Sequence, residues 1–159
     1  MGNIFSGSEI VELGIQIEKN GRDFYSALTR RSKDTKAKET FEFLAGEETK
    51  HIGVFEEILK NTENYSPAES YPGEYMAYMS ALAQEYVFTR KDQGAEIAGK
   101  ITSDLQALEL GMGFERDSIV FYEGMKKTVP EHEIKIVDEL ISQEQRHLVM
   151  LSELKQNFK

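Results

Sequence analysis

The sequence predicts an all-α protein: a four-helix bundle made of two helical hairpins joined by a long crossover. Four segments place buried-type residues three and four positions apart, which is the spacing of a helix that packs one face against others. The two halves of the chain repeat one another at an offset of 96 or 97 residues, and the segment between them contains two of the three prolines. We expect all 159 residues to form one domain.

The first hairpin is predicted over residues 8–31 and 35–60. Ser6 or Ser8 can cap its first helix, and Ser32 to Asp34 supply the turn between the helices. Acidic residues and a histidine interrupt both buried seams. The first seam is Val11, Gly14, Glu18, Gly21, Tyr25 and Leu28, and the second is Phe41, Leu44, Glu48, His51, Phe55 and Ile58.

The crossover is predicted over residues 61–102. Residues 61–73 read as a loop, residues 74–88 as a short helix, and residues 90–100 as a polar segment without a helix. The short helix is expected to cover the core of the bundle, and a homodimer interface is the alternative for its aromatic face. The residues concerned are Tyr75, Tyr78, Met79, Leu82 and Tyr86.

The second hairpin is predicted over residues 103–128 and 131–157. Thr102, Ser103 or Asp104 can cap its first helix, and Val129-Pro130 forms the turn. Its seams again carry polar residues among apolar ones. They are Leu108, Gly111, Glu115, Ser118, Tyr122 and Met125, then Val137, Leu140, Glu144, His147, Leu151 and Leu154.

A Glu-x-x-His motif occurs once in each half, as Glu48 with His51 and Glu144 with His147. Glutamate and histidine three apart on a helix point the same way and can bind one metal ion. The remaining histidine, His132, is expected at the surface. Each motif repeats the other, since adding 96 to the first pair of numbers gives the second.

The positions of the turns predict that these motifs meet two further glutamates. Glu18 and Glu48 each lie 15 residues from Lys33, inside the first turn, so a hairpin folded there brings them level. The same argument pairs Glu115 with Glu144. Four carboxylates and two imidazoles then converge at mid-bundle, where their charge suits two divalent metal ions per chain. These ligand types suit iron or manganese and tolerate zinc.

With these residues in view, the chain resembles the rubrerythrin-like branch of the ferritin superfamily. The resemblance rests on Glu18-Lys19 with Phe24-Tyr25 and on their repeats, Glu115-Arg116 with Phe121-Tyr122. It implies a ferritin-like bundle with a non-haem di-iron site that reacts with oxygen or hydrogen peroxide. Tyr25 and Tyr122 would bond to ligand carboxylates. The implied metal ligands are Glu18, Glu48, His51, Glu115, Glu144 and His147.

Two departures from the family pattern change what is expected. Classical rubrerythrins carry a rubredoxin-like domain with four cysteines, whereas this chain has none, so an external electron donor is expected. The family also has a glutamate three residues after the third-helix ligand, and here Ser118 holds that position. We therefore expect slow reaction with peroxide and a six-ligand site closer to that of bacterial ferritins.

Composition narrows the class of partner. The net charge of −9 disfavours nucleic acid and anionic membranes, and no leader or membrane span is evident, so a cytoplasmic protein is expected. The predicted function is a non-haem di-iron oxidoreductase of rubrerythrin type. It would couple Fe(II) oxidation to reduction of hydrogen peroxide or oxygen, in oxidative-stress defence. The alternatives are an iron-storage protein with a ferroxidase centre and a non-catalytic metal-binding scaffold.

Overall fold

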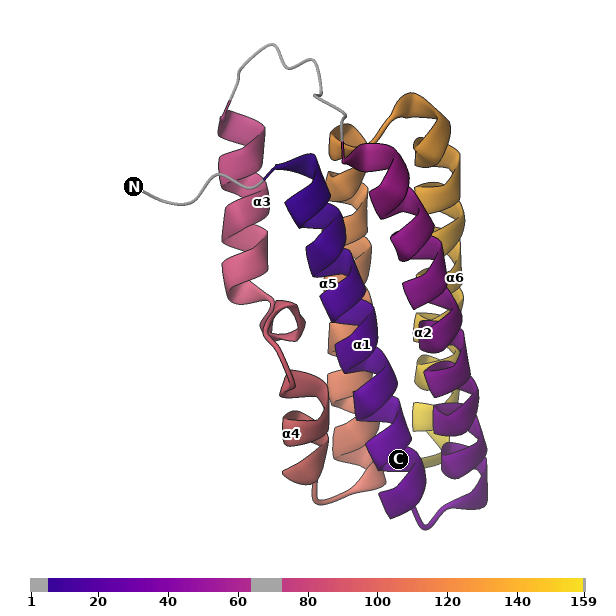
Figure 1. The fold of residues 1–159 in the computed structure, drawn as a ribbon. Coiled ribbons are helices and arrows are strands. Elements are labelled where there is room, and N and C mark those ends of the chain that lie inside the picture. Colours follow the sequence, from indigo (N-terminus) through magenta and orange to yellow (C-terminus); the bar gives the residue numbers. More distant parts are fainter. Residues whose placement is uncertain (1–5, 64–72, 159) are drawn as a thin grey trace.

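A computed structural model describes residues 6–63 and 73–158, and four long helices dominate that part of the chain. They are α1 (Gly7–Arg31), α2 (Thr35–Thr62), α5 (Asp104–Met125) and α6 (Glu131–Lys155). Figure 1 shows them side by side as a bundle. The predicted all-α four-helix bundle is confirmed. None of the described helices is long and apolar enough to cross a membrane.

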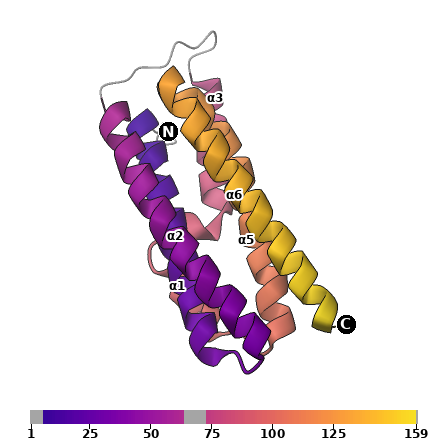
Figure 2. The same cartoon turned by 90° about the vertical axis from the view of Figure 1, so that its right-hand side faces the viewer.

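Each long helix runs antiparallel to its two neighbours. Helices α1 and α2 form the first hairpin, α5 and α6 form the second, and the hairpins meet where α1 packs on α5 and α2 on α6 (Figure 1 and Figure 2). Every residue of the four predicted seams is buried. Three of the helices start at capping residues, because Ser6, Asp34 and Ser103 accept hydrogen bonds from backbone N–H groups of α1, α2 and α5. Ser6 and Ser103 were among the predicted caps, whereas Asp34 was predicted only as part of the turn.

The ends of three long helices differ slightly from the prediction. Helix α2 continues two residues further, to Thr62. Helix α5 stops at Met125 and is followed by a 3-10 turn, η2 (Lys126–Thr128), and α6 stops at Lys155 before η3 (Gln156–Phe158). The predicted spans to 128 and 157 therefore each combine an α-helix with a tighter last turn, a common way for helices to end.

The crossover contains more helix than the sequence indicated. Beside the expected short helix, now α3 (Glu74–Glu85) followed by η1 (Val87–Thr89), residues Gln93–Gly99 form a further helix, α4. The prediction of a non-helical segment over residues 90–100 was wrong. Helix α4 buries only Gly94 and Ala98, so it presents no apolar stripe that periodicity could detect. Most of the predicted loop, residues 64–72, lies outside the described residues.

Helix α3 covers the core as expected, with one exception. Met79 and Tyr86 are buried, Tyr75 and Leu82 are half-buried, and Tyr78 is 48% exposed. The expectation of a covering role was therefore wrong for Tyr78. The alternative of a homodimer interface on this face stays a prediction. His132 is at the surface as predicted, its side chain being 71% exposed.

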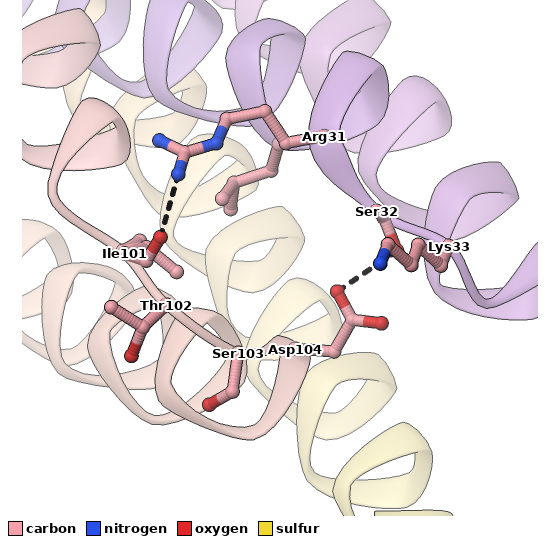
Figure 3. Close-up of a pocket in the computed structure, with 8 residues that line it drawn as sticks. Arg31, Ser32, Lys33, Ile101, Thr102, Ser103 and Asp104 are labelled. Carbon is pink, nitrogen blue, oxygen red and sulfur yellow. Dashed lines mark hydrogen bonds between the residues drawn. The ribbon is translucent and has the colours of Figure 1, made fainter.

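Two polar residues of α1 attach the second half of the crossover to the bundle. The buried Asn20 amide donates to the carbonyls of Phe88 and Arg90 and accepts from the N–H of Gly94. Further along α1, the guanidinium of Arg31 donates to the carbonyl of Ala98 and to that of Ile101. Figure 3 shows the bond to Ile101. The pocket of about 460 Å³ drawn in Figure 3 is lined by none of the six candidate ligands.

Helix α4 lies so close to α1 that only glycine fits at position 94. A Cβ atom on Gly94 would be 1.9 Å from the backbone oxygen of Asn20, whereas one on Gly99, in the same helix, would meet nothing within 4 Å. We expect Gly94→Ala to lower the free energy of unfolding by about 1–3 kcal/mol, because α4 must move away. Gly99→Ala is the matched control. Urea unfolding of both variants measures the difference, and equal stabilities would contradict the described contact.

Candidate metal centre

The six predicted ligands meet in the middle of the bundle. Helix α1 supplies Glu18, α5 supplies Glu115, and α2 and α6 each supply a glutamate and a histidine one turn apart. None of the six is more than 5% exposed. The hairpin geometry expected from the turn positions is thus present: Glu18 lies level with the motif on α2, and Glu115 with the motif on α6.

The ligand atoms fall into two overlapping sets that could each hold one metal ion. Within each set, one nitrogen or oxygen per residue lies within 4.8 Å of all the others. Glu48 and Glu144 belong to both sets. The first set is completed by Glu18 and His51, and the second by Glu115 and His147. Two sites that share two carboxylates are the arrangement of a bridged metal pair.

Both histidines direct the same ring nitrogen toward the carboxylates. The Nδ1 atom of His51 lies 2.8 Å from Oε1 of Glu144 and 3.4 Å from Oε2 of Glu18. The Nδ1 atom of His147 lies 3.2 Å from Oε2 of Glu144 and 3.3 Å from Oε1 of Glu48. The two rings stack with their centroids 5.6 Å apart. Each imidazole is therefore placed to bind a metal ion through Nδ1.

Each of two buried tyrosines bonds to a carboxylate of the opposite hairpin. The hydroxyl of Tyr25 donates to Oε1 of Glu115 at 2.6 Å, and that of Tyr122 donates to Oε1 of Glu18 at 2.5 Å. These bonds to carboxylates are the ones that the sequence led us to expect. They fix the orientation of both glutamates, and Oε2 of Glu18 remains without a hydrogen bond.

A further residue, Gln143, orients His51 and was not predicted. Its Oε1 atom lies 2.6 Å from Nε2 of His51, on the side of the ring away from the cluster. The repeat contained a usable signal. Gln143 and Glu47 directly precede the two motif glutamates, and both line a pocket of about 290 Å³ beside His147. A residue that directly precedes a motif glutamate is therefore a candidate for a hydrogen bond to the histidine of the other motif.

The cluster fits a pair of metal ions because several of its polar atoms lack a partner. Oε2 of Glu18, Oε1 of Glu48, Oε1 of Glu144 and Nδ1 of His51 are buried without a hydrogen bond of acceptable geometry. Buried polar atoms normally find partners, and unpaired ones are costly in a low-dielectric interior. All four atoms belong to the two candidate sets. A mixed oxygen and imidazole donor set suits iron, manganese or zinc.

Comparison with known families decides the assignment. The family model for rubrerythrin matches residues 9–155, which is nearly the whole chain. The chain belongs to the rubrerythrin family. No curated protein and no solved structure gives a significant match. The resemblance inferred from the paired Glu18 and Glu115 segments is thus confirmed, and with the buried glutamate and histidine sets it supports metal binding by a ferritin-like protein.

In this rubrerythrin-family protein, burial controls the protonation of the metal-free cluster. Burial, reinforced by the charge of Glu144, raises the pKa of Glu48 and of Glu115 well above the ordinary value. Burial would also raise the pKa of Glu144, but a hydrogen bond from Glu115 and the two nearby imidazoles lower it instead. Burial lowers the pKa of His51, but the negative charge of Glu18 and the close approach of Glu144 outweigh this effect and raise the pKa to about 11. Protons thus occupy positions that metal ions would take.

One side of the cluster carries hydroxyl groups that no repeat predicts. The hydroxyl of Ser118 lies 2.8 Å from that of Tyr86, and the two hydroxyls lie 2.9 and 3.0 Å from the carbonyl oxygen of Phe114, so these three contacts share two protons. Ser118 was singled out in the sequence, but Tyr86 was expected only to cover the core. Tyr86 reaches the site from the crossover, which has no counterpart in the repeat, so periodicity gave no signal for it.

The raised pKa values predict that the metal-free protein loses stability as pH rises from roughly 5 to 8. Glu48 and Glu115 keep their protons in the folded chain, whereas in the unfolded chain they release them above the ordinary glutamate pKa of 4.5. His51 likewise keeps a third proton that the unfolded chain releases above the ordinary histidine pKa of 6.5. The folded state then holds more protons, so the free energy of unfolding falls by about 1.4 kcal/mol per pH unit for each extra proton. Glu144, with its lowered pKa, is ionised in both states throughout this window.

Thermal unfolding of the chelator-treated protein across this pH range measures the effect. The metal-loaded protein is the control and should change in the opposite direction, because metal binding requires the deprotonated ligands. A metal-free protein that becomes more stable toward pH 8 would contradict the assigned protonation.

Proposed function

We propose that this protein holds two metal ions, iron in the natural state, and couples the oxidation of Fe(II) to the reduction of hydrogen peroxide or oxygen. The observation that carries this proposal is the pair of overlapping donor sets that share Glu48 and Glu144. Membership of the rubrerythrin family supports the same conclusion. The proposed role in the cell is the removal of these oxidants.

The donor sets suggest which residues hold which ion. Glu18 and His51 would serve one ion, Glu115 and His147 the other, and the two shared glutamates both. Four carboxylates then balance the charge of two divalent ions, which removes the repulsion between buried acids. Iron supplies the ability to give up and regain an electron, which no side chain of this cluster offers.

The protein's own residues orient the ligands and handle protons. Tyr25 and Tyr122 hold Glu115 and Glu18 through hydrogen bonds across the two hairpins. Gln143 fixes the ring of His51 so that Nδ1 faces the carboxylates. Because each of the six ligand side chains is at most 5% exposed, the cluster is shielded from bulk water. Such shielding strengthens the electrostatic interactions within it.

Reduction of an oxidant must be followed by return of the electrons. A cluster of glutamate and histidine without cysteine offers no second redox group, and the chain has no cysteine at all. We therefore propose that a separate electron donor reduces the iron between turnovers. This donor is the partner that the function requires.

Metal analysis with optical spectroscopy tests the function directly. Protein purified without added metal is assayed for iron, manganese and zinc, loaded with Fe(II) without air, and then mixed with oxygen or hydrogen peroxide. The proposal expects two irons per chain and an absorbance change that is complete after one turnover. Continued uptake of iron into a large assembly would favour storage instead. A colourless protein that contains only zinc and does not react would favour a scaffold.

The ligand assignment predicts the effect of removing single carboxylates. We expect Glu115→Ala and Glu18→Ala each to lower bound metal from two ions toward one per chain, because each glutamate serves one of the two sets. Glu12→Ala, at an exposed position of α1, is the control and should bind metal fully. Elemental analysis of folded, metal-loaded protein gives the ratio. Full occupancy in both cluster variants would show that the metal is elsewhere.

Metal binding should also stabilise the fold, because the ligands come from four helices and assemble only in the folded chain. Free metal at a hundredfold excess over its dissociation constant adds about 2.7 kcal/mol to the free energy of unfolding for each site. Melting curves recorded with and without a chelator at pH 7 should therefore differ. Superimposable curves would indicate that the cluster does not bind metal.

A further inference from the structure

Two cavities approach the cluster from one side of the bundle, and Tyr86 separates them. The inner cavity, of about 10 Å³, lies between α1, α5 and the crossover and is bordered by Glu48 and Glu115. The outer pocket, of about 130 Å³, lies between α3 and α5. Tyr86 lines both of them. The remaining lining residues of the outer pocket are Leu82, Glu85, Asp117, Val120 and Phe121.

The inner cavity combines apolar walls with hydroxyl groups. Ile17, Phe88 and Phe114 supply the apolar walls, and Ser118 and Tyr86 supply a pair of hydroxyls. Tyr25 also lines the cavity, with its hydroxyl bonded to Glu115. Gly21 also lines the cavity and leaves the space beside Glu48 open. A Cβ atom at this position would lie only 2.9 Å from Oε2 of Glu48. The cavity therefore opens directly onto the carboxylate shared by both donor sets.

The hydroxyl pair can accept hydrogen bonds from a small molecule. Ser118 and Tyr86 contact each other and the carbonyl of Phe114, so their two protons are taken up by these three contacts. Each hydroxyl oxygen has a further lone pair available as an acceptor.

We propose that the inner cavity binds the small neutral oxidant before it reacts, and that the oxidant enters through the outer pocket past the ring of Tyr86. This inference rests on the proposed function and adds the substrate's binding place and route. A cavity of about 10 Å³ has room for roughly one molecule of the size of water, which excludes organic hydroperoxides. Hydrogen peroxide and dioxygen are the oxidants of the proposed function that are this small.

Blocking the entrance tests the route. Val120 is 45% exposed at the outer pocket, so Val120→Trp can fill the pocket without disturbing the core. Val149 is 53% exposed on α6 and does not line either cavity, so Val149→Trp is the matched control. With equal iron loading, we expect Val120→Trp to slow oxidation by both oxidants at least fivefold, which corresponds to about 1 kcal/mol. Val149→Trp should match the natural protein.

Removing one hydroxyl separates the two oxidants. Tyr86→Phe keeps the ring but deletes an acceptor for hydrogen peroxide, whereas dioxygen has no proton to donate. We expect this variant to react more slowly with hydrogen peroxide and unchanged with dioxygen. The natural protein should also react with hydrogen peroxide much faster than with cumene hydroperoxide. Equal rates for the two peroxides would overturn the proposal.

Dissolved oxygen gives a readout that needs no iron and no turnover. Oxygen is paramagnetic, so in the metal-free protein under a few bar of oxygen it should broaden NMR signals of Ile17, Phe88 and Phe114 more than those of Leu44 and Val137. The latter two are fully buried elsewhere in the core. Uniform broadening would overturn the inner cavity as a binding place. If the natural, iron-loaded protein did not oxidise its iron at all, the proposed function would be rejected instead. The NMR measurement does not depend on that function, so the two failures can be told apart.

Discussion

The burial of four carboxylates at one point is the constraint on which the rest of the structure depends. Acids so close together in a low-dielectric interior cannot all be ionised unless positive charge is present. In the metal-free chain that charge is supplied by protons on Glu48, Glu115 and His51. Oε2 of Glu18 and Nδ1 of His51 remain without a hydrogen bond although Tyr122 and Gln143 hold the other atoms of these groups, which suits an exchange of protons for cations.

The two hairpins supply equal halves of this cluster, but the crossover makes its surroundings unequal. In the repeat, Ser118 corresponds to Gly21, and both lie at the inner cavity. Only one of them has a hydroxyl, and the crossover brings Tyr86 to that hydroxyl. Under the proposed function, the symmetric part of the structure would account for binding two ions, whereas the unsymmetric part gives one side of the cluster a distinct polar environment. The two ions would therefore differ in reactivity.

The sequence predicted the parts of this structure that depend on helical periodicity. The seams, the caps and the meeting of six ligands follow from 3,4 spacing and from the positions of two turns, and the structure places them accordingly. Helix α4 was missed because its buried residues are small, and its position depends on Asn20 of a distant helix. Gln143 and Tyr86 were also missed, and both act through contacts between elements far apart in the chain. The repeat offered a signal for Gln143, which directly precedes a motif glutamate, but none for Tyr86, which lies in the unrepeated crossover.

The bonds from Tyr25 and Tyr122 to the opposite hairpin have an evolutionary consequence. One hairpin alone contains three of the six ligands, and its tyrosine finds its acceptor only in the other half. The chain thus has the layout of a twofold dimer of hairpins whose subunits have been fused through a linker. A half-length ancestor could have assembled the same centre only as a pair. Gene duplication and fusion would then have freed the crossover to diverge, since nothing in the other half had to match it.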